Sequence, residues 1–265
     1  MKRFCFFLLL AISGAAHSQT DLNALLETTH TPEYDREVIR KKLSSFLLPL
    51  AGSHASEIQL LRKTFRKVHA TFLKQYVAYS DVDRIFSSGQ YDCLTATALF
   101  SYVLDHLNYS YEIIETNYHI FLVVYTAKGK ILLETTDRFG GFVMDEAVIS
   151  ERMRSYQENQ IPASSPAKFY YQYSFELNRK ISSEKLVGLV YYNQAVRAFN
   201  QHDWITSSLL LERANALYAS PRCEEFGPIL IQSVLESSLT EELKTRCLVR
   251  LRNFWTKKSE IIASN

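Results

Sequence analysis

The segment from Cys93 to Thr136 constrains the fold more than any other part of the chain. Its first part, CLTATALFSYVLDH, has a broad apolar face at helical spacing. Three runs rich in β-branched and aromatic residues then follow with short links, at 111–116, 119–125 and 130–136. Sequential strands with short connections favour an antiparallel sheet, which offers the helix a surface to pack on. The segment therefore predicts an α+β unit.

The middle run, HIFLVVY, is apolar at nearly every position after His119. A half-exposed strand would alternate apolar and polar residues, so this run is expected to be a central strand that is covered on both faces. The following TAKGK supplies a hairpin turn, which the sequence allows either as a tight turn centred on Lys128-Gly129 or as a wider loop starting near Thr126.

Helical patterns flank this unit on both sides. Residues 19–80 form an N-terminal helical segment with predicted helices at 33–50 and 55–79, and residues 81–165 form the core. A polar stretch, ENQIPASSPAKF, then separates the core from a C-terminal helical region at 180–265. Its run YYNQAVRAFNQHDWITSSLLLERANALYASP loosely resembles a tetratricopeptide repeat, and an ordinary helical hairpin is the alternative. The predicted helices of this region span 183–200, 204–218, 228–236 and 240–255.

Residues 1–18 have the composition of a secretory signal peptide. Lys2 and Arg3 precede a short apolar run, and Ala16-His17-Ser18 offers small residues around a cleavage point near Ser18. The apolar run is too short to span a bilayer comfortably, and no later stretch is apolar enough to do so. We therefore expect an exported protein, periplasmic or secreted, without an integral membrane segment after signal cleavage.

The charge balance bears on the class of partner. Cleavage after residue 18 would remove Lys2 and Arg3 but no acidic residue, leaving 28 basic and 28 acidic side chains. A protein that binds nucleic acid normally has a basic excess, so no nucleic-acid partner is expected.

The predicted mature chain has three cysteines, which leaves at least one thiol unpaired. Cys223 and Cys247 lie in the same helical region and could form a disulfide in an oxidising compartment. They could equally be two buried, reduced core residues, since free cysteine behaves as a small apolar side chain. Cys93 is the free thiol in the first case.

Cys93, His119 and a following acid occur in an order that can support thiol catalysis. Cys93 opens a predicted helix, where free N–H groups and the helix dipole favour an anion. His119 opens a predicted strand and could accept the thiol proton. Glu134 and Asp137 end the next strand, and either carboxylate could orient the imidazole.

The same segment resembles the transglutaminase-like superfamily, whose core is papain-like. Gly89-Gln90-Tyr91-Asp92-Cys93 with Thr97-Ala98-Leu99 is similar to the family's Gly-x-Cys-x-x-x-Ala-x-Leu run, in a slightly longer form. His119-Ile120-Phe121 fits its His-x-Phe pattern. Glu134-Thr135-Thr136 aligns with its Asp-Pro-Thr, with Glu in place of Asp and Thr in place of Pro. The resemblance covers roughly residues 81–145.

The choice of acid depends on the hairpin. A tight turn at Lys128-Gly129 places His119 opposite residue 138, with Glu134 on the same face as His119 and Asp137 pointing away. The wider loop brings Glu134 level with His119. Glu134 is favoured because it shares a face with His119 and because it aligns with the family's acid. Asp137 is the alternative.

The resemblance implies thiol-dependent acyl transfer or hydrolysis on protein or peptide amides, through Cys93, His119 and the acid. The Cys93 backbone N–H is the expected oxyanion donor, and Gln90 is a further candidate. No cofactor and no metal is expected, because the sequence has no clustered acidic ligand loop. The alternative function is an inactive scaffold that binds a protein partner through its C-terminal helices.

Overall fold

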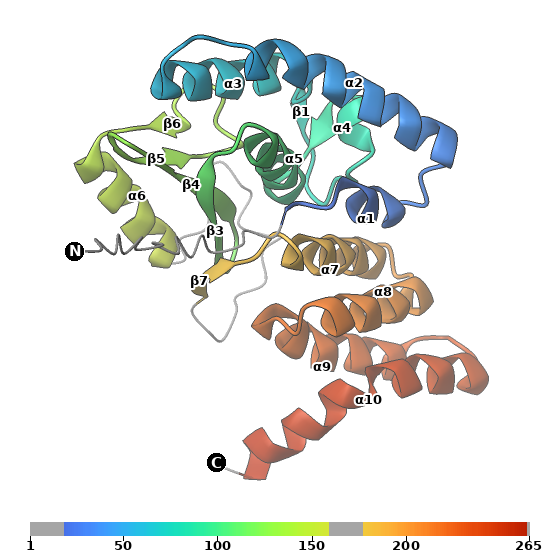
Figure 1. Cartoon of the computed structure of the whole chain (residues 1–265). Coiled ribbons are helices and arrows are strands. Elements are labelled where there is room, and N and C mark those ends of the chain that lie inside the picture. Colours follow the sequence, from blue (N-terminus) through green and yellow to red (C-terminus); the bar gives the residue numbers. More distant parts are fainter. Residues whose placement is uncertain (1–18, 159–176, 264–265) are drawn as a thin grey trace, which may run out of the picture.

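The computed structural model describes residues 19–158 and 177–263 (Figure 1). These residues form the predicted α+β structure. N-terminal helices precede a five-stranded antiparallel sheet, which packs with helix α5 (Cys93–His106), and four helices form the C-terminal region of the described chain. The predicted signal peptide lies outside the described residues.

The N-terminal helices are α1 (Leu22–Glu27), α2 (Glu33–Ala51) and α3 (Glu57–Thr71). The prediction of one helix over 55–79 is wrong at its end, because the chain becomes extended after α3. The backbone N–H groups of Lys74 and Gln75 donate to the carbonyl of Gly89 at 2.8 and 3.1 Å. This contact leads into a two-stranded parallel sheet around a short helix, made by β1 (Gln75–Tyr76), α4 (Arg84–Ser87) and β2 (Gln90–Tyr91).

The main sheet has the strand order β6-β5-β4-β3-β7, and all neighbours are antiparallel. Its strands are β3 (Ser110–Thr116), β4 (Ile120–Thr126), β5 (Gly129–Leu133), β6 (Phe142–Val143) and β7 (Asn178–Ile181). The β4–β5 turn consists of residues 127 and 128, because Thr126 pairs with Gly129. The observed strand register lies between the register of the tight turn and that of the wider loop, the two connections that the sequence allowed.

Strand β4 is the middle strand and is covered on both faces, as its apolar run predicted. Ile120, Leu122 and Val124 face the large core that α5 shares with the N-terminal helices. Phe121 and Val123 face a smaller cluster on the other side of the sheet, which includes α6 (Glu146–Gln157). The start of β4 is therefore held rigidly between two layers of helix.

The C-terminal helices are α7 (Lys185–Asn200), α8 (Trp204–Leu217), α9 (Pro221–Glu236) and α10 (Glu241–Ala263). They stack side by side below the core (Figure 1) and share an apolar cluster of their own. Helix α9 begins at Pro221 instead of 228, because the Ser220 hydroxyl caps the Arg222 N–H and proline suits the first helical position. None of the helices between residues 19 and 158 or 177 and 263 is long and apolar enough to cross a membrane.

Cys223 and Cys247 are free thiols buried in α9 and α10. Their sulfurs lie 3.9 Å from two different backbone carbonyls, those of Tyr218 and Trp204. Of the two possibilities that the sequence left open, the disulfide is wrong and the pair of buried core thiols is the one found. Burial raises the pKa of Cys223 to about 12, so this thiol is unreactive at neutral pH.

Candidate active site

Cys93 is the first residue of α5, and the residue before it fixes the start of that helix. The buried Asp92 carboxylate accepts the backbone N–H of Thr95 at 2.7 Å and its hydroxyl at 2.9 Å. The Thr95 hydroxyl also lies 2.9 Å from the Asp92 N–H, which completes a capping box. The Cys93 side chain is half-buried and lines a cavity. The local sequence therefore places the thiol at a helix N-terminus, as predicted.

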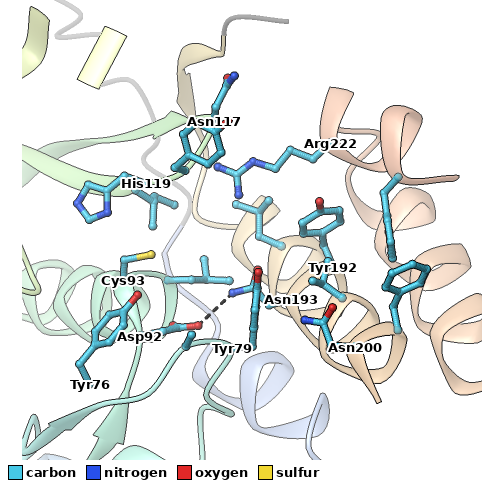
Figure 2. Close-up of a pocket in the computed structure, with 18 of the residues that line it drawn as sticks. Tyr76, Tyr79, Asp92, Cys93, Asn117, His119, Tyr192, Asn193, Asn200 and Arg222 are labelled. Atoms are coloured by element: carbon cyan, nitrogen blue, oxygen red, sulfur yellow. Dashed lines mark hydrogen bonds between the residues drawn. The ribbon is translucent and has the colours of Figure 1, made fainter. Parts of the chain in front are cut away.

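His119 lies in the turn that enters β4. Its backbone N–H donates to the Thr116 hydroxyl at 3.1 Å, and its carbonyl accepts the Thr116 N–H at 2.8 Å. These two bonds fix the end of the β3–β4 hairpin. Figure 2 shows His119 next to Cys93, and both side chains line the same cavity. The nucleophile and the base candidate thus come together from α5 and from the sheet.

Glu134 follows β5 and holds the other side of the imidazole. Its Oε2 lies 2.5 Å from His119 Nε2. The register of β4 and β5, continued past Leu133, places Glu134 opposite Phe121, two residues from His119 and on the same face. The other carboxylate oxygen, Oε1, accepts the backbone N–H and the hydroxyl of Thr136 at 3.1 and 2.7 Å.

Sequence reasoning missed Tyr156 of α6, which is part of the same network. Its hydroxyl donates to Glu134 Oε2 at 2.9 Å, and its ring centroid lies 5.3 Å from that of His119. The tyrosine therefore helps to hold both members of the pair. The sequence gives no signal for this contact, because it depends on how α6 packs on the sheet.

The electrostatics of His119 and Glu134 are dominated by their contact. Burial alone would lower the pKa of His119 and raise that of Glu134. The opposite charges and the hydrogen bond outweigh burial, with Cys93 adding to the effect on His119 and Thr136 to that on Glu134. The pKa of His119 therefore lies well above its ordinary value of 6.5, and that of Glu134 lies well below 4.5. The contact therefore favours the charged forms of both groups, an imidazolium beside a carboxylate.

The alternative acid, Asp137, is not part of this network. Its Oδ1 accepts the backbone N–H groups of Phe139 and Gly140 at 3.1 and 2.8 Å, and its side chain is 42 % exposed. Asp137 therefore serves as a turn residue. Gln90 lies in β2 and is not among the residues that line the cavity at Cys93.

The thiol and the imidazole open onto a cavity of about 860 Å³ (Figure 2). Core residues from β1, α5 and the β3–β4 turn line one side of it. The opposite side comes from helices α7 and α9, with Tyr192, Asn193 and Arg222 among their contributions. The sequence predicted the C-terminal helices as a separate region and did not predict that they complete this cavity.

Comparisons with protein-family models, with curated proteins and with solved structures gave no match for this chain.

Proposed function

We propose that this chain is a transglutaminase-like thiol enzyme that hydrolyses peptide amides or transfers their acyl groups. One observation supports the proposal above all others: His119 lies next to Cys93 at the edge of a cavity, and its ring is bonded to Glu134. This is the relation of nucleophile, base and orienting acid that thiol catalysis requires. The helix that starts at Cys93 and the antiparallel sheet would then be a papain-like core.

The first half-reaction forms a thioester. The Cys93 sulfur attacks the acyl carbon of an amide, and a sulfur–carbon bond forms while the oxygen becomes an oxyanion. The Cys93 backbone N–H can stabilise this oxyanion, because N–H groups in the first turn of a helix have no partner within the helix. The carbon–nitrogen bond then breaks, and the amine leaves with a proton from the His119 imidazolium.

The second half-reaction releases the acyl group. Water or a second amine attacks the thioester and gives its proton to His119, and the sulfur–carbon bond breaks to free the Cys93 sulfur. Glu134 holds the ring so that one nitrogen faces the sulfur throughout. The incoming nucleophile decides between hydrolysis and transfer, and the proposal covers both. The predicted export signal would place this chemistry outside the cytoplasm, on protein or peptide substrates.

The reactivity of Cys93 tests this proposal without knowledge of the substrate. The protein is treated with iodoacetamide at pH 6 and 8, and alkylation at each cysteine is followed by mass spectrometry. At pH 6, Cys93 is expected to react at least about tenfold faster than glutathione, because the imidazolium beside it favours the thiolate. His119→Ala should remove this advantage, and His54→Ala, at an exposed position, should keep it. Buried Cys223 and Cys247 serve as internal references.

If Cys93 reacts no faster than glutathione at pH 6, the proposed enzyme is excluded. The same result would favour the inactive scaffold with C-terminal helices that bind a protein partner. An advantage that survives His119→Ala would exclude His119 as the group that activates the thiol.

A further inference from the structure

The wall of the cavity that faces Cys93 comes from the C-terminal helices and carries an apolar face beside the polar side chains of Asn193, Asn200 and Arg222. Positions on one face of α7 follow each other at steps of three and four, and α9 adds two more at the same side. These residues are Leu189, Tyr192, Val196, Phe199, Phe226 and Ile229. A face with this periodicity would be covered by another helix in an ordinary helical stack. Here it borders the cavity that contains the thiol.

The aromatic residues of this wall pack against one another. The ring of Phe226 packs edge-on against Tyr192 at 5.9 Å and against Phe199 at 5.2 Å between centroids. Tyr192 and Phe226 are 4 and 7 % exposed, so only a small part of each side chain reaches the cavity. Val196 and Phe199 are half-buried and present more of their surface to it. A preformed apolar wall of this kind binds an apolar group without having to reorganise.

Helix α7 is fixed to the core, so the wall keeps its distance from the thiol. The Asn193 amide donates to Asp92 Oδ2 at 3.1 Å, directly beside Cys93 (Figure 2). One helical turn further on, Arg197 forms a 2.8 Å ion pair with Asp81.

A second attachment holds the start of α9. The Tyr218 hydroxyl, just before α9, donates to the buried carboxylate of Glu115 in β3 at 2.6 Å. Arg222 pairs with the same carboxylate at 3.4 Å. The cavity therefore lies between the core and two helices that hydrogen bonds and ion pairs hold in place.

The size of the cavity limits the class of substrate. A volume of about 860 Å³ lies within the range of roughly 300 to 1,000 Å³ for small-molecule sites. It is suited to a side chain or a short peptide end next to the thiol. Of the residues that line it, the charged side chains are Asp92, His119 and Arg222, and all three have partners within the protein.

We infer that the α7/α9 wall is the specificity subsite of this enzyme and takes an apolar, preferably aromatic, side chain on the acyl part of the substrate. The inference rests on the proposed thiol chemistry and narrows it. The acyl donor is then a peptide or acyl compound with an apolar group next to the scissile bond, and not the carboxamide of a glutamine side chain.

Two esters that acylate thiols test the subsite: 4-nitrophenyl acetate and 4-nitrophenyl 3-phenylpropanoate. The Cys93 sulfur forms a bond to the acyl carbon, the ester carbon–oxygen bond breaks and nitrophenolate leaves, which is measured by its absorbance. Each rate is divided by the rate of the same ester with glutathione. The protein is expected to prefer the phenylpropanoate by about tenfold or more after this correction.

Val196→Trp should fill the subsite and reduce this preference to about one. Val249→Trp is the matched control, because Val249 is 56 % exposed on α10, outside the cavity, and it should leave the preference unchanged. Val196→Thr keeps the shape of the side chain and adds a hydroxyl, so it should lower the preference several-fold without the risk of overpacking.

A binding experiment separates the subsite from the chemistry. Calorimetry with Cys93→Ala should detect 3-phenylpropanamide, and adding Val196→Trp should abolish the signal. Binding without Cys93-dependent acylation would overturn the proposed function and retain the subsite. Acylation without a preference, or a preference that Val196→Trp and Val249→Trp change equally, would overturn the subsite alone. Absence of both acylation and binding would overturn both.

Discussion

At the scale of single residues, the carboxylate of Glu134 is surrounded by hydrogen-bond donors. It is 5 % exposed and has bonds from His119, Tyr156 and both donors of Thr136. A buried carboxylate with this many donors stays ionised, and its charge acts on the imidazole at short range. His119, Tyr156 and Thr136 together hold the side chain of Glu134 in place.

Replacing Glu134 with glutamine tests this role. Glu134→Gln keeps the shape but removes the charge that raises the pKa of His119, so less imidazolium remains at pH 6. The alkylation rate of Cys93 at pH 6 should fall by about tenfold. Asp137→Asn is the matched control, since its amide oxygen can still accept the two turn N–H groups. The alkylation rate of Cys93 in this variant should stay within about twofold of that in the unchanged protein. An equal loss in both variants would contradict the assignment of Glu134.

At the scale of elements, the short loop between β5 and β6 decides where Glu134 lies. The predicted strand reached Thr136, but β5 ends at Leu133. Beyond it, the Glu134 N–H donates to the Gly141 carbonyl at 2.8 Å, and the Gly141 N–H donates to the Asp137 carbonyl at 2.9 Å. The loop therefore folds back on itself, turns Asp137 outwards and leaves Glu134 under His119.

This loop requires a glycine at position 141. A Cβ there would lie 2.2 Å from the Glu134 carbonyl oxygen and 2.3 Å from that of Asp137. Gly141→Ala should therefore lower the free energy of unfolding by about 1–3 kcal/mol and slow the alkylation of Cys93 at pH 6. Gly52→Ala is the control, because its nearest atom is 3.7 Å away and its φ is −81°. Urea unfolding gives the stabilities, and equal stability of both variants would contradict the close approach.

At the scale of the whole molecule, the buried His69 couples the stability of the fold to pH. It is fully buried between the rings of Phe65 and Phe100, and its ring nitrogens have no hydrogen-bond partner among the described residues. Burial lowers the pKa of His69 to about 4, with Arg138 adding to the effect and the Asp137 and Glu134 charges opposing it. The folded protein therefore keeps this imidazole neutral.

The sign of the effect follows from where the proton binds. Below about pH 6.5 the unfolded chain takes up a proton at His69 that the folded protein refuses, so stability falls as the pH drops from 6.5 towards 4. His119 has a raised pKa, so its contribution to the free energy of unfolding is complete below pH 6.5. That contribution is lost only as the pH rises above 6.5.

When the pH is lowered from 7.5 to 4.5, the free energy of unfolding of the protein should fall by about 2–3 kcal/mol more than that of His69→Leu. Urea unfolding at each pH measures both values. The leucine variant serves as the reference for all carboxylates that titrate in the same range. Parallel pH profiles for the two proteins would show that His69 does not titrate in this way.

The accuracy of the sequence-based predictions followed the range of the interactions. The helix at Cys93 and the buried middle strand depend on local patterns of apolar residues, so both were predictable. The end of α3 was not, because the Gly89 carbonyl captures the N–H groups of Lys74 and Gln75 from fifteen and fourteen residues away. The turn between β4 and β5 was also misplaced. The predicted tight turn lies one residue too late in the chain, and the predicted wider loop lies one residue too early.

The sequence by itself determined the α+β layout and the order of Cys93, His119 and Glu134, because helix and strand periodicities and capping are properties of neighbouring residues. Only the tertiary structure decided that Glu134 and not Asp137 meets His119, that Tyr156 joins them, and that α7 and α9 form the far wall of the cavity. The bond from Asn193 to Asp92 spans 101 residues. Contacts of that range arise from packing between layers, and no local pattern in the chain records them.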